Sequence, residues 1–183
     1  EKDGLWASLA WMSILAHANK DTAEDAPLVS VRDIVTQHWA KYGRHFYCRY
    51  DYENVESDAA DKVVDRIRSE FIDKDIEEDT EADISLVSAE EFSYTDPVDG
   101  STARSQGLIL GFQVGGDEAR VVFRLSGTGS AGATIRMYLE KYERDAEKHG
   151  QSAPSALKAL ADKAVELVQM QALTGRESPT VIT

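Results

Sequence analysis

The chain has 183 residues, of which 42% are hydrophobic and 29% charged, and its formal net charge at pH 7 is −13. These proportions are typical of a globular protein that is long enough to form a core. The negative charge argues against binding to nucleic acid or to anionic membranes, so we expect neither partner. A single cysteine, Cys48, excludes an internal disulfide and suits a reducing compartment. We find no signal peptide and no apolar run of membrane-spanning length.

Apolar residues at helical spacing predict two helices at the start of the chain. The first carries an apolar face over residues 5–16, and the second is expected over residues 31–41. A polar linker, residues 19–28, separates them. Few other elements are available to cover these helices, so we expect a partly exposed apolar patch that includes Trp6 and Trp39 if the segment stands alone.

The pattern after Gly43 predicts a different architecture. Large apolar and charged residues alternate over residues 44–53, which indicates a strand, and a helix is expected over residues 59–71. Further strands are expected at 84–87, 108–114 and 120–125, and helices at 131–148 and 154–173, with a hairpin turn at Gly115-Gly116-Asp117. This order predicts an α+β fold, with an antiparallel sheet and helices on one face.

Several polar groups carry weaker signals. The acidic stretch from Asp73 to Asp83 has neither the glycines nor the flanking strand of a metal site, so we interpret it as a solvated loop. The residues Asp96, Asp99 and Gly100 are interpreted as a turn. No histidine pair has metal-ligand spacing, and we expect no catalytic role for His17, His38, His45 or His149. No serine has the context of a catalytic triad nucleophile. Arg44 and Arg49 either face a cleft or pair with Asp51 or Glu53.

The segment RLSGTGSAGATIR, residues 124–136, is the candidate site. It follows an apolar run over residues 119–125, and its glycines can turn several backbone N–H groups toward one point. A helix starting near Ala131 would add its N-terminal N–H groups. Two arginines offer planar forks that match phosphate oxygens, and two hydroxyls add donors. The candidate phosphate ligands are Arg124, Ser126, Gly127, Thr128, Gly129 and Arg136.

Other interpretations of this segment are an ordinary turn or a nucleotide-binding loop. From the local pattern alone, a turn followed by a helix cap is as good an interpretation as a phosphate site. A nucleotide P-loop fits badly because the segment has no lysine. The glycines do match the spacing G-x-G-x-x-G, but Ser155 and Ala156 stand where a dinucleotide site needs an acidic residue.

Five segments resemble, in the same order, the eukaryotic-type phosphoglucomutases of the α-D-phosphohexomutase superfamily. They are EKDGLWASLAWMSILAHANKD from Glu1, KYGRHFYCRYDYE from Lys41, YTDPVDGSTARSQGL from Tyr94, RLSGTGSAGATIR from Arg124 and TGRESPTVIT from Thr174. The resemblance implies that residues 1–43 are the helices that close the third, α/β domain of such an enzyme. Residues 44–183 would be the fourth domain, with a fold like that of the TATA-binding protein and the family's phosphate-binding loop.

The resemblance also implies an activity. Phosphoglucomutases interconvert glucose 1-phosphate and glucose 6-phosphate through a phosphoserine enzyme and glucose 1,6-bisphosphate, with Mg²⁺ as cofactor. The family's serine, metal and sugar-reading loops do not occur in this sequence. We therefore expect the chain to be the C-terminal third of a larger cytoplasmic enzyme, inactive alone. Its partners would be a phosphosugar and the remaining mutase domains.

Within such an enzyme, this segment would grip the phosphate that is not reacting. Lys2, in the sequence EKDG, is implied to lie near the transferring phosphoryl group, although a terminal lysine is otherwise interpreted as solvated. A non-catalytic relative used as a scaffold in secretion or adhesion remains an alternative, as does a stand-alone phosphosugar-binding module.

Overall fold

The computed structural model describes residues 2–129 and 132–183. The chain divides into two compact units, Glu1–Arg44 and His45–Thr183. The first contains a pair of helices, and the second contains a sheet covered by helices.

The first unit confirms the two predicted helices, α1 (Gly4–Ala18) and α2 (Val31–Tyr42). Helix α2 begins with a capping box between Ser30 and Asp33, which satisfies N–H groups that the first turn leaves unpaired. Leu5 and Trp6 are 82% and 68% exposed, so the apolar patch expected on α1 is uncovered in this unit. Trp39, in contrast, is half-buried because the guanidinium of Arg44 lies 4.1 Å from the centre of its ring.

The second unit is built on a six-stranded sheet with the order β2-β3-β4-β5-β1-β6. The strands are β1 (Arg44–Val55), β2 (Ile84–Thr95), β3 (Thr102–Val114), β4 (Asp117–Gly129), β5 (Gly132–Glu143) and β6 (Val181–Ile182). The pairs β2–β3, β3–β4, β4–β5 and β1–β6 are antiparallel. The sheet therefore combines a four-strand meander with a strand, β1, that comes from far earlier in the chain.

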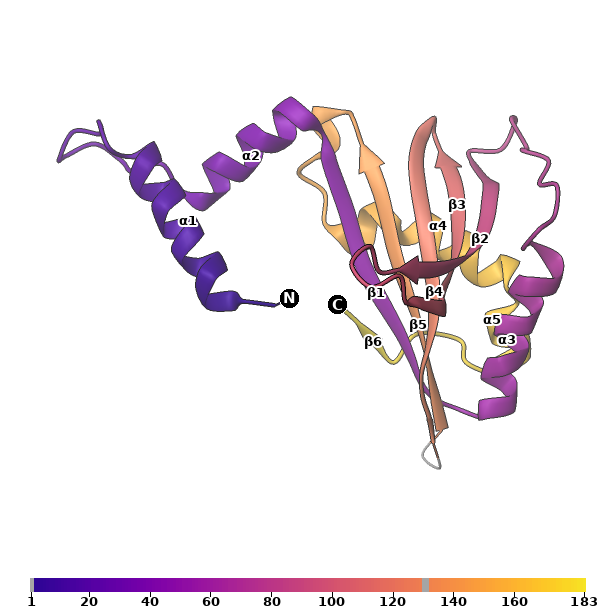
Figure 1. Cartoon of the computed structure of the whole chain (residues 1–183). Helices are drawn as coiled ribbons and strands as arrows, with labels where there is room; N and C mark the ends of the chain where they lie inside the picture. The colour runs from indigo at the N-terminus through magenta and orange to yellow at the C-terminus, as the bar shows by residue number, and fades with distance from the viewer. Residues whose placement is uncertain (1, 130–131) are drawn as a thin grey trace. The chain divides into compact units, whose positions relative to one another are not determined.

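Helices cover one face of this sheet (Figure 1). They are α3 (Ser57–Glu70), α4 (Ala153–Leu167) and α5 (Met170–Thr174), and a short 3-10 helix, η1 (Ala146–Lys148), precedes α4. One continuous core joins the helices to the sheet; its fully buried members include Ile67 of α3, Leu160 of α4 and Met137 of β5. This arrangement confirms the predicted α+β fold.

The two faces of the sheet differ in chemistry because side chains alternate along each strand. In β4, Val121 and Phe123 are buried against the helices, whereas Arg124 is exposed on the other side. In β5, Ile135 and Met137 are buried, and Arg136 between them is partly exposed. The face without helices, called the open face below, therefore carries the polar side chains.

The helix predicted over residues 131–148 is wrong. The described part of this range is mostly strand β5, followed by η1, while residue 131 lies outside the described residues. Ile135 and Leu139 have helical spacing, but Met137 between them is also buried, so the true period is two. The open face of β5 carries Thr134, Tyr138 and Tyr142, which are residue types that favour strands, and pairing with β4 decides the outcome.

Other differences concern the lengths of the elements. Strands β2, β3 and β4 extend well beyond the short runs that were predicted, and β6 was not predicted at all. The hairpin turn at Gly115 and Gly116 is confirmed, and both glycines have positive φ angles of 59° and 86°. Polar residues in β2 and β3 hid these strands from a search for apolar runs.

A buried polar cluster fixes the end of β5. The Glu143 carboxylate accepts hydrogen bonds from the Asp145 N–H at 3.0 Å and from Lys141 Nζ at 3.1 Å. The Nε2 atom of His149, which is buried, lies 2.9 Å from the Glu143 carbonyl oxygen. Burial would raise the pKa of Glu143, but the Asp145 N–H and Lys141 outweigh it and hold that pKa below its ordinary value.

The alternation of faces predicts unequal effects of one substitution at adjacent positions. Val121→Ala, at a fully buried site, is expected to lower the free energy of unfolding by about 2 kcal/mol, since two carbons leave the core. Val122→Ala, on the open face, should cost less than half as much. Urea denaturation measures both values, and equal losses would contradict the assigned faces.

Glu143 predicts a pH-dependent contribution to stability. Because its folded pKa is depressed, the stabilisation is present above its ordinary value of 4.5 and is lost as the pH falls through the folded pKa. Glu143→Gln should therefore lower the free energy of unfolding by about 1–2 kcal/mol at pH 7. The difference from the unmodified protein should shrink below pH 4.5. A difference that is constant from pH 7 to pH 3.5 would refute the charge effect.

Candidate anion site at the β4–β5 hairpin

The candidate segment forms the end of the β4–β5 hairpin rather than a loop leading into a helix. Strand β4 runs to Gly129 and β5 starts at Gly132, and these two glycines are register partners. The pairing is irregular between Ser126 and Gly129, where Gly127 has a φ angle of +65°. The helix N-terminus expected to support an anion is therefore absent from the described residues, and any binding depends on the hairpin and its side chains.

The register brings the two predicted arginines together. Arg124 of β4 and Arg136 of β5 are direct partners in the antiparallel pair. Directly opposite residues project from the same face, so both side chains lie on the open face with neighbouring Cβ atoms. Two like charges in this position repel each other and destabilise the sheet. An anion between them would relieve this repulsion.

Arg124 is an exposed cation with room for its stem. An added Cβ at Gly107 of β3 would lie 3.3 Å from Arg124 Cγ, so the stem passes over a position where a side chain would crowd it. Within the part of the chain that the structure describes, no carboxylate forms an ion pair with Arg124. Its charge is therefore available to a ligand.

A groove of about 300 Å³ between α3 and the sheet lies on the helix-covered side, and its lining includes Asp61 and Arg68 of α3 as well as Arg124. At the rim, Arg68 of α3 donates to the Glu91 carboxylate at 2.7 Å. This hydrogen bond holds the pKa of Glu91 below its ordinary value, so the carboxylate stays charged and neutralises Arg68. The groove also contains the Asp61 carboxylate, so its two carboxylates and two guanidinium groups balance in formal charge.

A buried carboxylate lies beside the guanidinium group of Arg136. Asp51 of β1 is only 4% exposed; its Oδ1 atom accepts a hydrogen bond from Arg49 Nε at 2.8 Å, and its Oδ2 atom lies 3.9 Å from Arg136 Nε. The Arg136 Nε atom is buried and has no hydrogen-bond partner among the described residues. One carboxylate thus serves two arginines, which leaves this cluster with net positive charge.

The structure describes only some of the predicted hydroxyl and glycine ligands. Ser126 is half-buried, and its register partner is Thr134, which the sequence interpretation did not include. Gly127 is exposed, and a Cβ added there would meet no atom within 4 Å. Gly129 belongs to β4, whereas the side chain of Thr128 lies outside what the structure describes. The hairpin therefore offers donors beside the arginine pair.

Lys2 belongs to the first unit, where it is exposed, whereas the other predicted ligands belong to the second. Its proximity to a phosphoryl group stays a prediction. Arg49 forms the expected ion pair with Asp51 at 2.8 Å. Arg44 stacks on Trp39.

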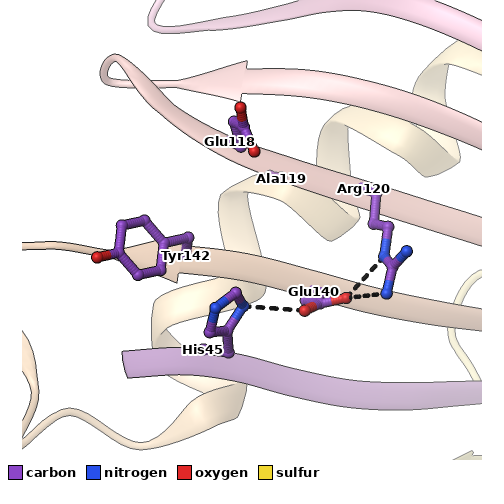
Figure 2. A pocket seen from close by; sticks show the side chains of 6 residues that line it. All are labelled: His45, Glu118, Ala119, Arg120, Glu140 and Tyr142. Atoms are coloured by element: carbon purple, nitrogen blue, oxygen red, sulfur yellow. Dashed lines mark hydrogen bonds and ion pairs between the residues drawn. The ribbon is translucent and has the colours of Figure 1, made fainter. Parts of the chain in front are cut away.

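A second polar cluster lies toward the other end of the open-face strands. Figure 2 shows His45 of β1 pointing to Glu140 of β5, which also meets Arg120 of β4. The His45 Nδ1 atom lies 2.9 Å from Glu140 Oε1, and Arg120 Nε donates to Glu140 Oε2 at 2.6 Å. These residues line a groove of about 300 Å³ with Glu118 and Tyr142. The carboxylates of Glu118 and Glu140 offset the charge of Arg120, so this groove suits an anion less than the arginine pair does.

Across residues 2–129 and 132–183, no three His, Cys, Asp or Glu side chains are grouped closely enough to hold a metal ion. Among the same residues, no helix combines the length and apolarity needed to cross a membrane.

Sequence reasoning missed three supports of the site, namely Gly107 beneath Arg124, Thr134 opposite Ser126 and the contact between Asp51 and Arg136. The first two depend on which residues face each other across neighbouring strands. The third had a visible signal, because Arg49 and Asp51 share a face of β1. Only the position of β1 beside β5 could add Arg136.

Comparison with known proteins gives consistent results. Residues 44–180 match the family model described as "Phosphoglucomutase-1, C-terminal domain". The chain is 52% identical to a chloroplastic phosphoglucomutase of Arabidopsis thaliana and 53% identical to a cytoplasmic phosphoglucomutase of Bromus inermis. Each alignment covers all of the present chain, but only 29% of the Arabidopsis protein and 32% of the Bromus protein. The chain thus spans about a third of the curated relatives that it matches.

A solved structure agrees with this match. The open form of the exocytosis-sensitive phosphoprotein pp63/parafusin, a phosphoglucomutase from Paramecium, superposes with a TM-score of 0.81 at 42% identity. The alignment covers 100% of this chain and 30% of that one. The similarity therefore extends to both units of the present chain.

The buried carboxylate behind Arg136 leads to a prediction. Asp51→Asn is expected to lower the free energy of unfolding by about 2 kcal/mol, because a charged hydrogen bond to Arg49 is lost and two arginines lose their shared counter-charge. Asp162→Asn, which removes the carboxylate of an exposed pair with Lys158 on α4, should cost less than about 0.5 kcal/mol. Similar losses in the two variants, measured by urea denaturation, would show that Asp51 has no special role.

Proposed function

Because this chain belongs to the phosphoglucomutase family, we propose that its β4–β5 hairpin grips a phosphate group of a sugar phosphate. The observation that carries the proposal is the direct pairing of Arg124 with Arg136 on the open face. A dianionic phosphate accepts hydrogen bonds from both guanidinium groups and offsets their repulsion. Ser126 and the accessible backbone of Gly127 supply further donors on the same strand.

The reaction that this site serves is the interconversion of glucose 1-phosphate and glucose 6-phosphate in the complete enzyme. There, a phosphoserine outside this segment donates its phosphoryl group, and glucose 1,6-bisphosphate is the intermediate. The hairpin holds the phosphate that is not reacting, in either orientation of the sugar. Binding energy from this remote group orients the reacting one, which is how positioning lowers the barrier.

The remaining functional groups are assigned to other parts of the enzyme. Mg²⁺, which neutralises charge in phosphoryl transfer, would be bound outside these residues, so this segment alone is inactive. Residues 1–43 are the closing helices of the third domain and residues 44–183 the fourth domain. Lys2 would approach the reacting phosphoryl group from the first of these. We assign the enzyme to the cytoplasm, as for the Bromus inermis relative.

One observation favours a second candidate, a role in secretion. The Paramecium relative is described as an exocytosis-sensitive phosphoprotein as well as a phosphoglucomutase. A phosphoglucomutase-like scaffold would retain the fold of this segment without requiring turnover. Measured mutase activity of the complete natural chain, absent or present, separates the two functions.

The proposal predicts the effect of removing Arg124. In the complete natural chain, Arg124→Ala should raise KM for glucose 1-phosphate and lower kcat, with a loss in kcat/KM of roughly 2–3 kcal/mol, or about 30- to 150-fold. Arg120→Ala, which removes an exposed arginine already paired with Glu140, is the matched control and should stay within about threefold of the unmodified enzyme. Unchanged kinetics in Arg124→Ala would refute the proposed phosphate grip.

A further inference from the structure

The turn end of the β4–β5 hairpin packs directly on the C-terminal end of β1. Gly132, the first residue of β5, has a φ angle of +88°, and an added Cβ there would lie 3.2 Å from the Val55 carbonyl oxygen and 3.3 Å from Asn54 Cα. Backbone thus packs against backbone at this point, and no flexible side chain separates the two segments. The position of the turn end of the hairpin therefore depends on the conformation of Asn54 and Val55.

Asn54 is held in an unusual conformation. Its φ angle of +55° lies in the left-handed region, which is uncommon for residues other than glycine. Its carbonyl oxygen accepts a hydrogen bond of 2.6 Å from Arg176 Nη2, a residue 122 positions later in the chain. The charged donor gives this contact more strength than a neutral pair. Arg176 therefore fixes the residue against which Gly132 packs.

Arg176 is itself positioned by the end of α5 and by the segment that follows. Its backbone N–H donates to Thr174 Oγ1 at 3.2 Å, and Gly175 ends α5 with a φ angle of +70°. The segment then runs along β1: Thr180 Oγ1 accepts from the Glu53 N–H at 2.8 Å, and Thr183 exchanges backbone hydrogen bonds of 2.7 and 2.9 Å with Arg49. Residues 176–183 thus form hydrogen bonds along the edge of β1 from Asn54 back to Arg49.

Resting on the proposed phosphate grip, we infer that Arg176 is a positioning residue for it: through the Asn54 carbonyl it sets the place of Gly132, and with it the hairpin. Arg136 lies four residues along β5 from Gly132, and Arg124 is its partner across the pair. A displacement of Gly132 at the turn end of the hairpin therefore moves both arginines relative to the phosphate. Small errors in donor position are costly in affinity and in rate. Arg176 acts through this contact and need not touch the ligand.

The test compares two arginines that each donate to a distant backbone carbonyl. Arg176 donates to Asn54, and Arg66 of α3 donates to the Leu167 carbonyl at 3.3 Å, away from the hairpin; both residues are half-buried. In the complete natural chain, Arg176→Ala is expected to raise KM for glucose 1-phosphate about tenfold, which corresponds to roughly 1.4 kcal/mol. Arg66→Ala should lower Tm about as much as Arg176→Ala does, but it should leave KM within about twofold of the unmodified enzyme.

The split between KM and kcat separates positioning from general stability. A variant that is merely less folded has fewer active molecules, so its apparent kcat falls while KM is unchanged. Arg176→Ala with reduced kcat and unchanged KM would therefore overturn the inference. A KM increase of the same size in Arg66→Ala would overturn it as well.

A second pair of variants tests the contact from its other side and serves if Arg176→Ala does not fold. Asn54→Gly keeps the carbonyl and the left-handed conformation, so KM should be unchanged. Asn54→Val, which disfavours that conformation, should raise KM as Arg176→Ala does. An unchanged KM in Asn54→Val would refute a route through Asn54, and a raised KM in Asn54→Gly would show that its side chain is the important group.

Failure of this inference is distinguishable from failure of the proposed function. Arg124→Ala is measured in the same assay. If that variant also has an unchanged KM, the phosphate grip itself is wrong. If Arg124→Ala raises KM while Arg176→Ala and Asn54→Val do not, the grip stands and only the positioning role of Arg176 is refuted.

Discussion

The register between β4 and β5 is the constraint on which the candidate site depends. It buries Val121 and Phe123 with Ile135 against the helices and, by the same alternation, places Arg124 opposite Arg136 on the open face. A slip of one residue would exchange the two faces, exposing the core and burying the charges. The stability of the core therefore enforces a like-charge pair that is unfavourable by itself. An arrangement that costs stability in this way is typical of a binding site.

The electrostatics of the site follow from how its charges are distributed. The chain as a whole carries a net charge of −13, which repels anions at long range. Within the second unit, however, Arg68 and Arg120 are neutralised by carboxylates, while Arg124 has no ion pair among the described residues and Arg136 shares Asp51 with Arg49. The affinity for phosphate must then come from short-range, directional contacts that salt screens weakly. This is consistent with a site that reads one group of a substrate rather than a broad charged surface.

Strand β1 connects the site to the rest of the second unit. Its buried face joins the core through Phe46 and Tyr52, while its open face supplies Asp51 behind Arg136. Its C-terminal end supports Gly132, and its edge is covered by β6 and the residues around it. The last residues of the chain thus stabilise the strand that positions both Arg136 and the turn end of the hairpin. The segment TGRESPTVIT therefore has a structural role in the second unit, since its residues bind both the edge and the end of β1.

The sequence by itself determined the class of fold, the hairpin at Gly115 and Gly116, the helices of the first unit and the segment that carries the two arginines. These features depend on local periodicity, turn residues and charge, which the chain displays directly. It could not decide that residues 132–143 form a strand, because Ile135 and Leu139 satisfy both periods and only pairing with β4 selects one. Nor could it show Gly107 beneath Arg124, or Arg176 on the Asn54 carbonyl, 122 positions away. Such contacts join segments that are distant in sequence, so only the tertiary structure brings them together.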